Sequence, residues 1–191
     1  DTVDFLIAAD TYHHVASITA GENVYELSFN LPTTNVLWSV ASSTSTGHLH
    51  VVFAANIVTN RLTELWLAGH GLTNAPFATE ALLDRDGDGA NALHEFVAGT
   101  DPTNRANVLA LLLQDVNAGS NAVPSQSIQG LRLSWPSAAE RTYSLYSATD
   151  MSSGFNLLVS NIFATPPSNV YTSNAPLLTN QLFRIEARFG E

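Results

Sequence analysis

Residues 84–95 form the stretch that most constrains how this chain can fold. They read Asp-Arg-Asp-Gly-Asp-Gly-Ala-Asn-Ala-Leu-His-Glu. Carboxylates stand at positions 1, 3, 5 and 12 of this stretch (Asp84, Asp86, Asp88 and Glu95), with Gly89 at position 6. Alternate side chains of a tightly wound loop point to the same side, so the three aspartates are expected to converge. Gly89 permits the sharp turn because glycine tolerates backbone angles that other residues avoid.

This spacing of oxygen ligands is the pattern of an EF-hand calcium loop. The predicted metal ligands are the side chains of Asp84, Asp86 and Asp88, the backbone carbonyl of Ala90, and both oxygens of Glu95. Glu95 is expected to lie in the first turn of a following helix. A large, flexible set of oxygen ligands favours Ca²⁺ over Mg²⁺ as the cofactor. The alternative is a solvated acidic turn, since Asp-Gly pairs are common in turns, but a turn does not require glutamate at position 12.

Charge and composition exclude several classes of protein. The net charge is −10, and the seven basic residues are all arginine. Nucleic-acid binding needs clustered basic residues, so no nucleic-acid partner is expected. No apolar run is long enough to cross a bilayer, so no membrane insertion is expected either. Cysteine is absent, which excludes disulfide and thiol chemistry. Asp1 is not an initiator residue, and we interpret the chain as a processed or trimmed piece of a longer one.

The hydrophobic pattern predicts a mainly β protein with three zones. Apolar residues alternate with polar ones in residues 1–58 and again in residues 106–191, as in antiparallel β-strands. Examples are Val3, Phe5 and Ile7; Val36, Trp38 and Val40; Leu131, Leu133 and Trp135; and Phe183, Ile185 and Ala187. We therefore expect two small antiparallel β-domains. Short strands at roughly ten-residue spacing indicate a fibronectin- or immunoglobulin-like sandwich for the second.

Residues 59–105 are predicted to be a short helical segment that carries the calcium loop and joins the two domains. Leu62, Leu65 and Trp66 have helical spacing, with Thr59 or Asn60 as the expected cap and Gly69 or Gly71 as the expected end. After the loop, Leu93, Phe96 and Val97 repeat the helical pattern, and Gly99 stands where a C-terminal cap is expected. Asp101, before Pro102, is expected to cap a turn rather than to bind the metal.

These motifs resemble a known class of protein. Asp84 to Gly89, Glu95-Phe96 and Gly99 to Asn104 resemble the calcium-binding segment, akin to thrombospondin type 3 repeats, of large secreted bacterial surface proteins. Residues 131–136 and 141–146 resemble the small β-sandwich that often follows that segment. Residues 12–15 and 50–54 are similar to bacterial extracellular β-repeat modules. The resemblance implies an extracellular or cell-surface location.

We expect an extracellular structural or adhesive protein, made rigid by calcium and without enzymatic activity. Modules resembling the first zone usually have further strands before it. If Asp1 is the natural mature terminus, the sheet of this zone is expected to lack a strand and expose an edge; the alternative is that Asp1 is a trimmed end. Such an edge can pair with further copies of the chain to form a filament or surface array. The alternative is an accessory, carbohydrate-binding part of a larger secreted enzyme. It would place Trp38, Trp66 or Trp135 on the surface, whereas their apolar patterns favour the core.

Histidines provide a second metal hypothesis. His48 and His50 share one face of an expected strand, which is suitable spacing for a pair of zinc or copper ligands, although no further ligand can be named. The simpler interpretation is a polar strand face in contact with water. His94, inside the calcium loop, is expected to point outward because imidazole is a poor calcium ligand.

Overall fold

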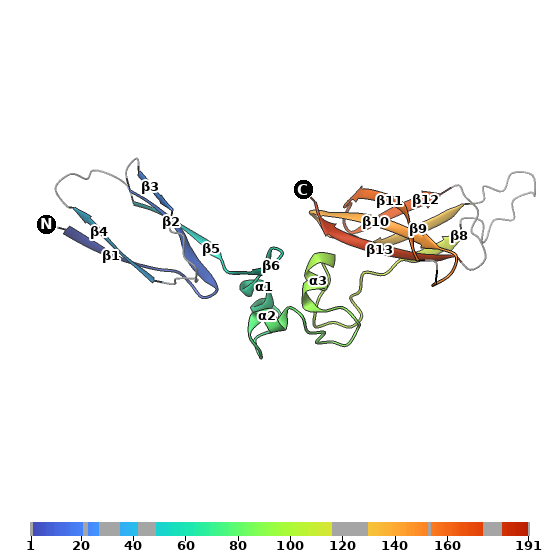
Figure 1. The fold of residues 1–191 in the computed structure, drawn as a ribbon, viewed down its shortest axis with the longest axis horizontal. Helices are drawn as coiled ribbons and strands as arrows, with labels where there is room; N and C mark the ends of the chain where they lie inside the picture. Colours follow the sequence, from blue (N-terminus) through green and yellow to red (C-terminus); the bar gives the residue numbers. More distant parts are fainter. Residues whose placement is uncertain are drawn as a thin grey trace, which may run out of the picture. The chain divides into compact units, whose positions relative to one another are not determined.

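The computed structural model describes residues 2–20, 23–26, 35–41, 49–115, 130–152, 154–173 and 181–190. The chain divides into two compact units, Asp1–Leu83 and Asp84–Glu191. The described residues are mainly β, and every strand pair is antiparallel (Figure 1). The expected middle segment, residues 59–105, is therefore shared between the units. The acidic loop belongs to the second unit, because the helix after it contacts that unit's sheet.

In the described part of the first unit, two small sheets enclose an apolar core, and a two-stranded hairpin follows them. The strands of the two sheets are β1 (Thr2–Ala8), β2 (His13–Ala20), β3 (Asn23–Glu26), β4 (Asn35–Ala41) and β5 (Leu49–Ala55). β1 pairs with β4, and β2 lies between β3 and β5. Ile7, Val15 and Ile18 are buried between the sheets, where Trp38 packs against them. The alternation predicted for β1 places Ile7 in the core, but Phe5 remains 41% exposed.

The helix predicted to start before Leu62 begins later than we expect. The chain first forms a hairpin of β6 (Ile57–Thr59) and β7 (Leu62–Thr63), and α1 spans Glu64–Gly69. Asn60 and Arg61 have φ angles of 43° and 67°. Two successive positive φ angles make the tight turn of a two-residue hairpin. Thr63 is the cap instead of Thr59 or Asn60, and its Oγ1 accepts a hydrogen bond of 3.1 Å from Trp66 N.

The end of helix α1 agrees with the prediction. α1 ends at Gly69, as the sequence predicts, and Gly71 has a φ of 71°. Leu67 is the residue of α1 that is buried, whereas Leu65 is 46% exposed, so the predicted stripe was wrong for Leu65. α2 (Phe77–Glu80) follows Pro76.

In its described residues, the second unit combines helix α3 (Ala92–Ala98) with two three-stranded sheets (Figure 1). One sheet has the order β12-β9-β8, with β8 Leu112–Asp115, β9 Leu131–Pro136 and β12 Ser168–Ser173. The other has the order β11-β10-β13, with β10 Arg141–Ala148, β11 Asn156–Phe163 and β13 Leu182–Phe189. Both sheets contribute to a single core.

Alternating residues of β9 and β10 form the centre of that core, as predicted for β9. Leu131, Leu133 and Trp135 of β9 are buried, together with Tyr143 and Leu145 of β10. The rings of Trp135 and Tyr143 meet edge to face, with centroids 5.7 Å apart. The residues predicted on β13, which include Phe183 and Ile185, pack against this cluster. Within the described part of the chain, none of the helices has the length and apolar character needed to span a bilayer.

Candidate metal centre

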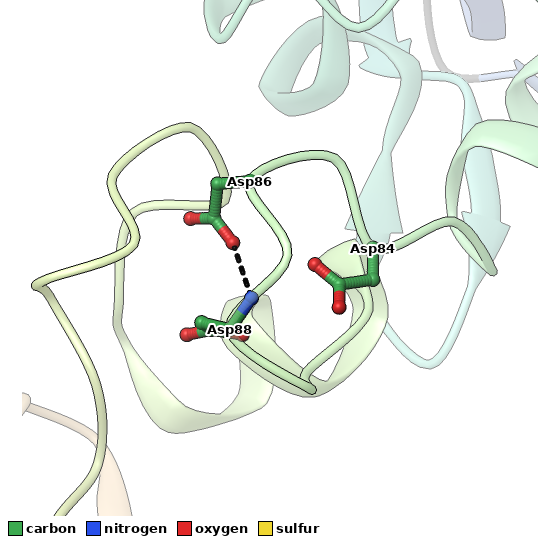
Figure 2. A group of neighbouring side chains, drawn as sticks. All are labelled: Asp84, Asp86 and Asp88. Carbon is green, nitrogen blue, oxygen red and sulfur yellow. Dashed lines mark hydrogen bonds between the residues drawn. The ribbon is translucent and has the colours of Figure 1, made fainter.

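The three aspartates of the acidic loop converge. One carboxylate oxygen each from Asp84, Asp86 and Asp88 lies within 4.8 Å of the others. Figure 2 shows the three side chains around the loop that precedes α3. Three like charges at this separation repel one another in water and repel more strongly where water is partly excluded. The arrangement is therefore suited to a multivalent cation.

Hydrogen bonds from backbone amides wind the loop around these carboxylates. Asp84 accepts from Gly87 N at 2.7 Å and from Gly89 N at 2.9 Å. Asp86 accepts from the amide of Asp88, two residues later (Figure 2), and Asp88 accepts in the same way from the amide of Ala90. Gly89 has a φ of 102°, which a residue with a side chain rarely adopts. The hydrogen bond from Gly89 lowers the pKa of Asp84, so this group stays ionised.

Glu95 lies in the first turn of α3, as the sequence predicts, and it is not one of the three converged carboxylates. The helix begins at Asn91, whose side chain accepts a hydrogen bond of 2.9 Å from His94 N. Glu95 is only 1% exposed, and its Oε1 accepts a hydrogen bond of 3.3 Å from the hydroxyl of Thr100. Burial, with the charges of Asp88 and Asp86, raises its pKa from 4.5 to about 7.

Two buried carboxylate oxygens near the loop have no hydrogen-bond partner. They are Oδ2 of Asp86 and Oε2 of Glu95. A buried polar atom without a partner costs free energy, on the order of 1–3 kcal/mol and more for a charged group. A cation in contact with both oxygens would compensate this cost. The orphaned oxygens therefore fit a metal site better than they fit a solvated acidic turn.

The other residues that the sequence analysis singled out lie as follows in the structure. Ala90 is half-buried at position 7 of the loop, and its amide donates to Asp88 Oδ1 at 2.7 Å. Asp101 accepts from Thr103 N and from Thr103 Oγ1, so it does cap the turn after α3. His94 is exposed, as expected. His50 is exposed on β5, and His48 lies outside the described residues, so the second metal hypothesis gains no further ligand.

Two residues near the site could not be identified from the sequence. Thr100 donates to Glu95, and Arg141 binds the last carbonyls of α3 although it lies 44 residues after Val97. A hydroxyl five residues after Glu95 fits no known spacing of metal ligands. A contact over 44 residues depends on tertiary structure. No protein family, curated protein or solved structure matches this chain.

Proposed function

We propose that residues 84–95 bind Ca²⁺ and that the ion stabilises the second unit. The proposed ligands are Asp84, Asp86, Asp88, the carbonyl of Ala90, and Glu95. The observation that carries the proposal is a pair of buried oxygens without hydrogen-bond partners, one on Asp86 of the converged aspartates and one on Glu95. Oxygen ligands of this number and charge suit a hard cation such as Ca²⁺.

The biological role that we propose is structural, in an extracellular or cell-surface protein. Lone calcium loops of extracellular modules bind with Kd values of roughly 10⁻⁴–10⁻³ M, which suits an environment rich in calcium. For the second unit we also propose a fibronectin- or immunoglobulin-like sandwich. The chain passes from one sheet to the other after β9, β11 and β12, and this alternation supports that assignment.

A melting experiment with and without calcium tests the proposal. At about 100 times its Kd, calcium should stabilise the unit by about 2.7 kcal/mol. For a unit of this size the melting temperature should then rise by roughly 10–20 °C, and limited proteolysis between residues 84 and 105 should slow. Circular dichroism in CaCl₂ and in EGTA measures the first effect, and MgCl₂ is the control for general ionic effects. Identical melting and proteolysis in calcium and in EGTA would refute the proposal.

We further propose that the first unit associates with other copies of the chain. Within the described residues, β1 and β4 pair only with each other. Leu6 and Leu37 lie opposite one another in this pair and are 73% and 68% exposed. Exposed strand edges beside apolar side chains favour strand addition between chains.

Sedimentation velocity tests this association. We expect concentration-dependent species larger than the 20.5 kDa monomer. The substitution Leu37→Lys should shift them toward the monomer, because a charge beside the strand edge opposes pairing. Leu157→Lys, at a residue of β11 that is 58% exposed, is the matched control. A wild-type protein that sediments as a monomer at all concentrations would contradict the proposal.

The positions of the tryptophans give no support to the alternative function, a carbohydrate-binding accessory module. Trp135 is buried in the core of the second unit. Trp38 packs against the core of the first unit. The ring centroids of Trp66 and His70 are 4.2 Å apart.

A further inference from the structure

The C-terminal end of α3 is held by the side chain of Arg141, the first residue of β10. Its Nε donates to the carbonyl of Val97 at 2.9 Å, and its Nη2 donates to the carbonyl of Phe96 at 2.8 Å. Its Nη1 donates to the carbonyl of Ala139 at 3.0 Å. The last carbonyls of a helix have no partner within the helix and carry partial negative charge. Arg141 therefore satisfies two of these carbonyls with a positive charge.

Aromatic rings surround the same guanidinium group. Its central carbon lies 4.1 Å from the ring centroid of Phe189, on β13, and 5.9 Å from that of Phe96, on α3. The two rings also contact each other, with centroids 5.4 Å apart. Cation–π contacts of this kind favour arginine, whose planar group can stack and donate hydrogen bonds at once. The three residues, called here the Arg141 cluster, connect α3 to both β10 and β13.

The Arg141 cluster begins one residue after the buried carboxylate of the metal centre. Glu95 precedes Phe96 directly, and both lie in the seven-residue helix α3. A helix of seven residues behaves as a rigid unit. Contacts that hold Phe96 and Val97 in place therefore also hold the backbone of Glu95. Thr100, which donates to Glu95, follows the helix by two residues. The position of the Glu95 carboxylate is therefore linked to the position of β10.

We propose that Arg141 is a positioning residue that couples calcium binding to the stability of the β10–β13 sheet. The inference rests on the calcium site proposed above. Coupling between two sites is reciprocal: if the metal stabilises the sheet through Arg141, then Arg141 must also strengthen metal binding. Without the guanidinium group, α3 loses its side-chain hydrogen bonds to β10, and binding at the loop no longer affects the sheet.

Substitution of Arg141 in the full chain tests the coupling. Two quantities are measured: calcium affinity, by isothermal titration calorimetry, and amide hydrogen exchange with and without calcium. In the wild-type protein, calcium should slow exchange in α3, β10 and β13. Arg141→Met should lower calcium affinity by roughly fivefold to tenfold, the range of a modest coupling free energy. In this variant calcium should still slow exchange in α3 but not in β10 or β13.

Two further variants separate coupling from general damage. Arg141→Lys keeps the charge but lacks the planar fork that binds two carbonyls, so its effects should be intermediate. If Arg141→Met does not fold, calcium affinity and hydrogen exchange in Arg141→Lys test the coupling instead. Arg132→Met removes an exposed arginine from β9 in the same unit and should behave like the wild-type protein.

The possible outcomes distinguish this inference from the proposed function. The inference is overturned if the Arg141 variants keep the wild-type calcium affinity and the wild-type effect of calcium on exchange in β10 and β13. That result would leave the proposed calcium site intact. A wild-type protein that binds no calcium would overturn both. The loss of the calcium effect on the sheet, with the effect on α3 retained, is the result that the coupling predicts.

Discussion

Replacing Glu95 with glutamine is expected to abolish stabilisation by calcium without destabilising the metal-free protein. Glutamine has the same shape but no charge, and a calcium site depends on the number of charged ligands. Loss of a direct ligand should exceed the roughly 10–100-fold loss of affinity typical of outer-shell substitutions. In EGTA, the variant should melt at or above the wild-type temperature, because it no longer holds a buried charge near Asp86 and Asp88.

Glu95→Gln is expected to lower the melting temperature in calcium but not in EGTA, and this difference makes the test specific. An ordinary structural role for Glu95 would lower stability in calcium and in EGTA alike. Glu140→Gln is the matched control, since Glu140 is an exposed carboxylate in the same unit. It should leave both melting temperatures unchanged. If Glu95→Gln binds calcium with wild-type affinity, Glu95 is not a ligand.

The pH dependence of calcium binding gives a further check on Glu95. Its pKa is raised from 4.5 to about 7, so the metal-free protein takes up a proton at this group below about pH 7. Calcium requires the ionised carboxylate, so its affinity should fall as the pH drops from 7 toward 4.5, by up to about tenfold per pH unit. Over the same range the metal-free unit should lose stability as the pH rises, because the folded state holds the proton more tightly than the unfolded state. Both trends should be absent in Glu95→Gln.

Replacing Gly99 with alanine is expected to destabilise the second unit strongly. Gly99 is the C-cap of α3 and has a φ of 78°, in the left-handed region. An added Cβ at this position would also overlap with the Cβ of Ala138. The backbone conformation costs an alanine about 1 kcal/mol, and overpacking adds typically about 1–3 kcal/mol. The expected loss is therefore roughly 2–4 kcal/mol in the free energy of unfolding, measured by urea denaturation in EGTA.

Two variants separate the two causes of this loss. Gly154 has a φ of 74°, but a Cβ added there would meet nothing within 4 Å, so Gly154→Ala reports the backbone cost alone. Combining Gly99→Ala with Ala138→Gly removes the overlap and should recover most of the difference between the two single variants. A Gly99→Ala protein that loses no more stability than Gly154→Ala would show that the close approach to Ala138 is unimportant.

Local patterns in the sequence were sufficient for much of the fold and of the candidate site. The alternation of Leu131, Leu133 and Trp135 predicted which face of β9 is buried, because side chains alternate between the two faces of any strand. Gly99 predicted the end of α3, because few other residues adopt the left-handed conformation. The spacing of the aspartates predicted their convergence, since a tight loop brings alternate side chains together. Each of these features depends on residues close in sequence.

Features that depend on strand pairing or on distant residues had to come from the three-dimensional structure. The apolar spacing of Leu62 and Leu65 fits a helix, but Asn60 and Arg61 turn the chain into a hairpin whose partner strand decides the conformation of Leu62. The sequence alone determined that residues 84–95 form an acidic loop that leads into the first turn of a helix. Only the tertiary structure decided that this helix belongs with the second unit, because it is held by Arg141 from a strand more than forty residues away. The carbonyls at the end of a helix can accept from any suitably placed donor, so local sequence cannot specify which one it will be.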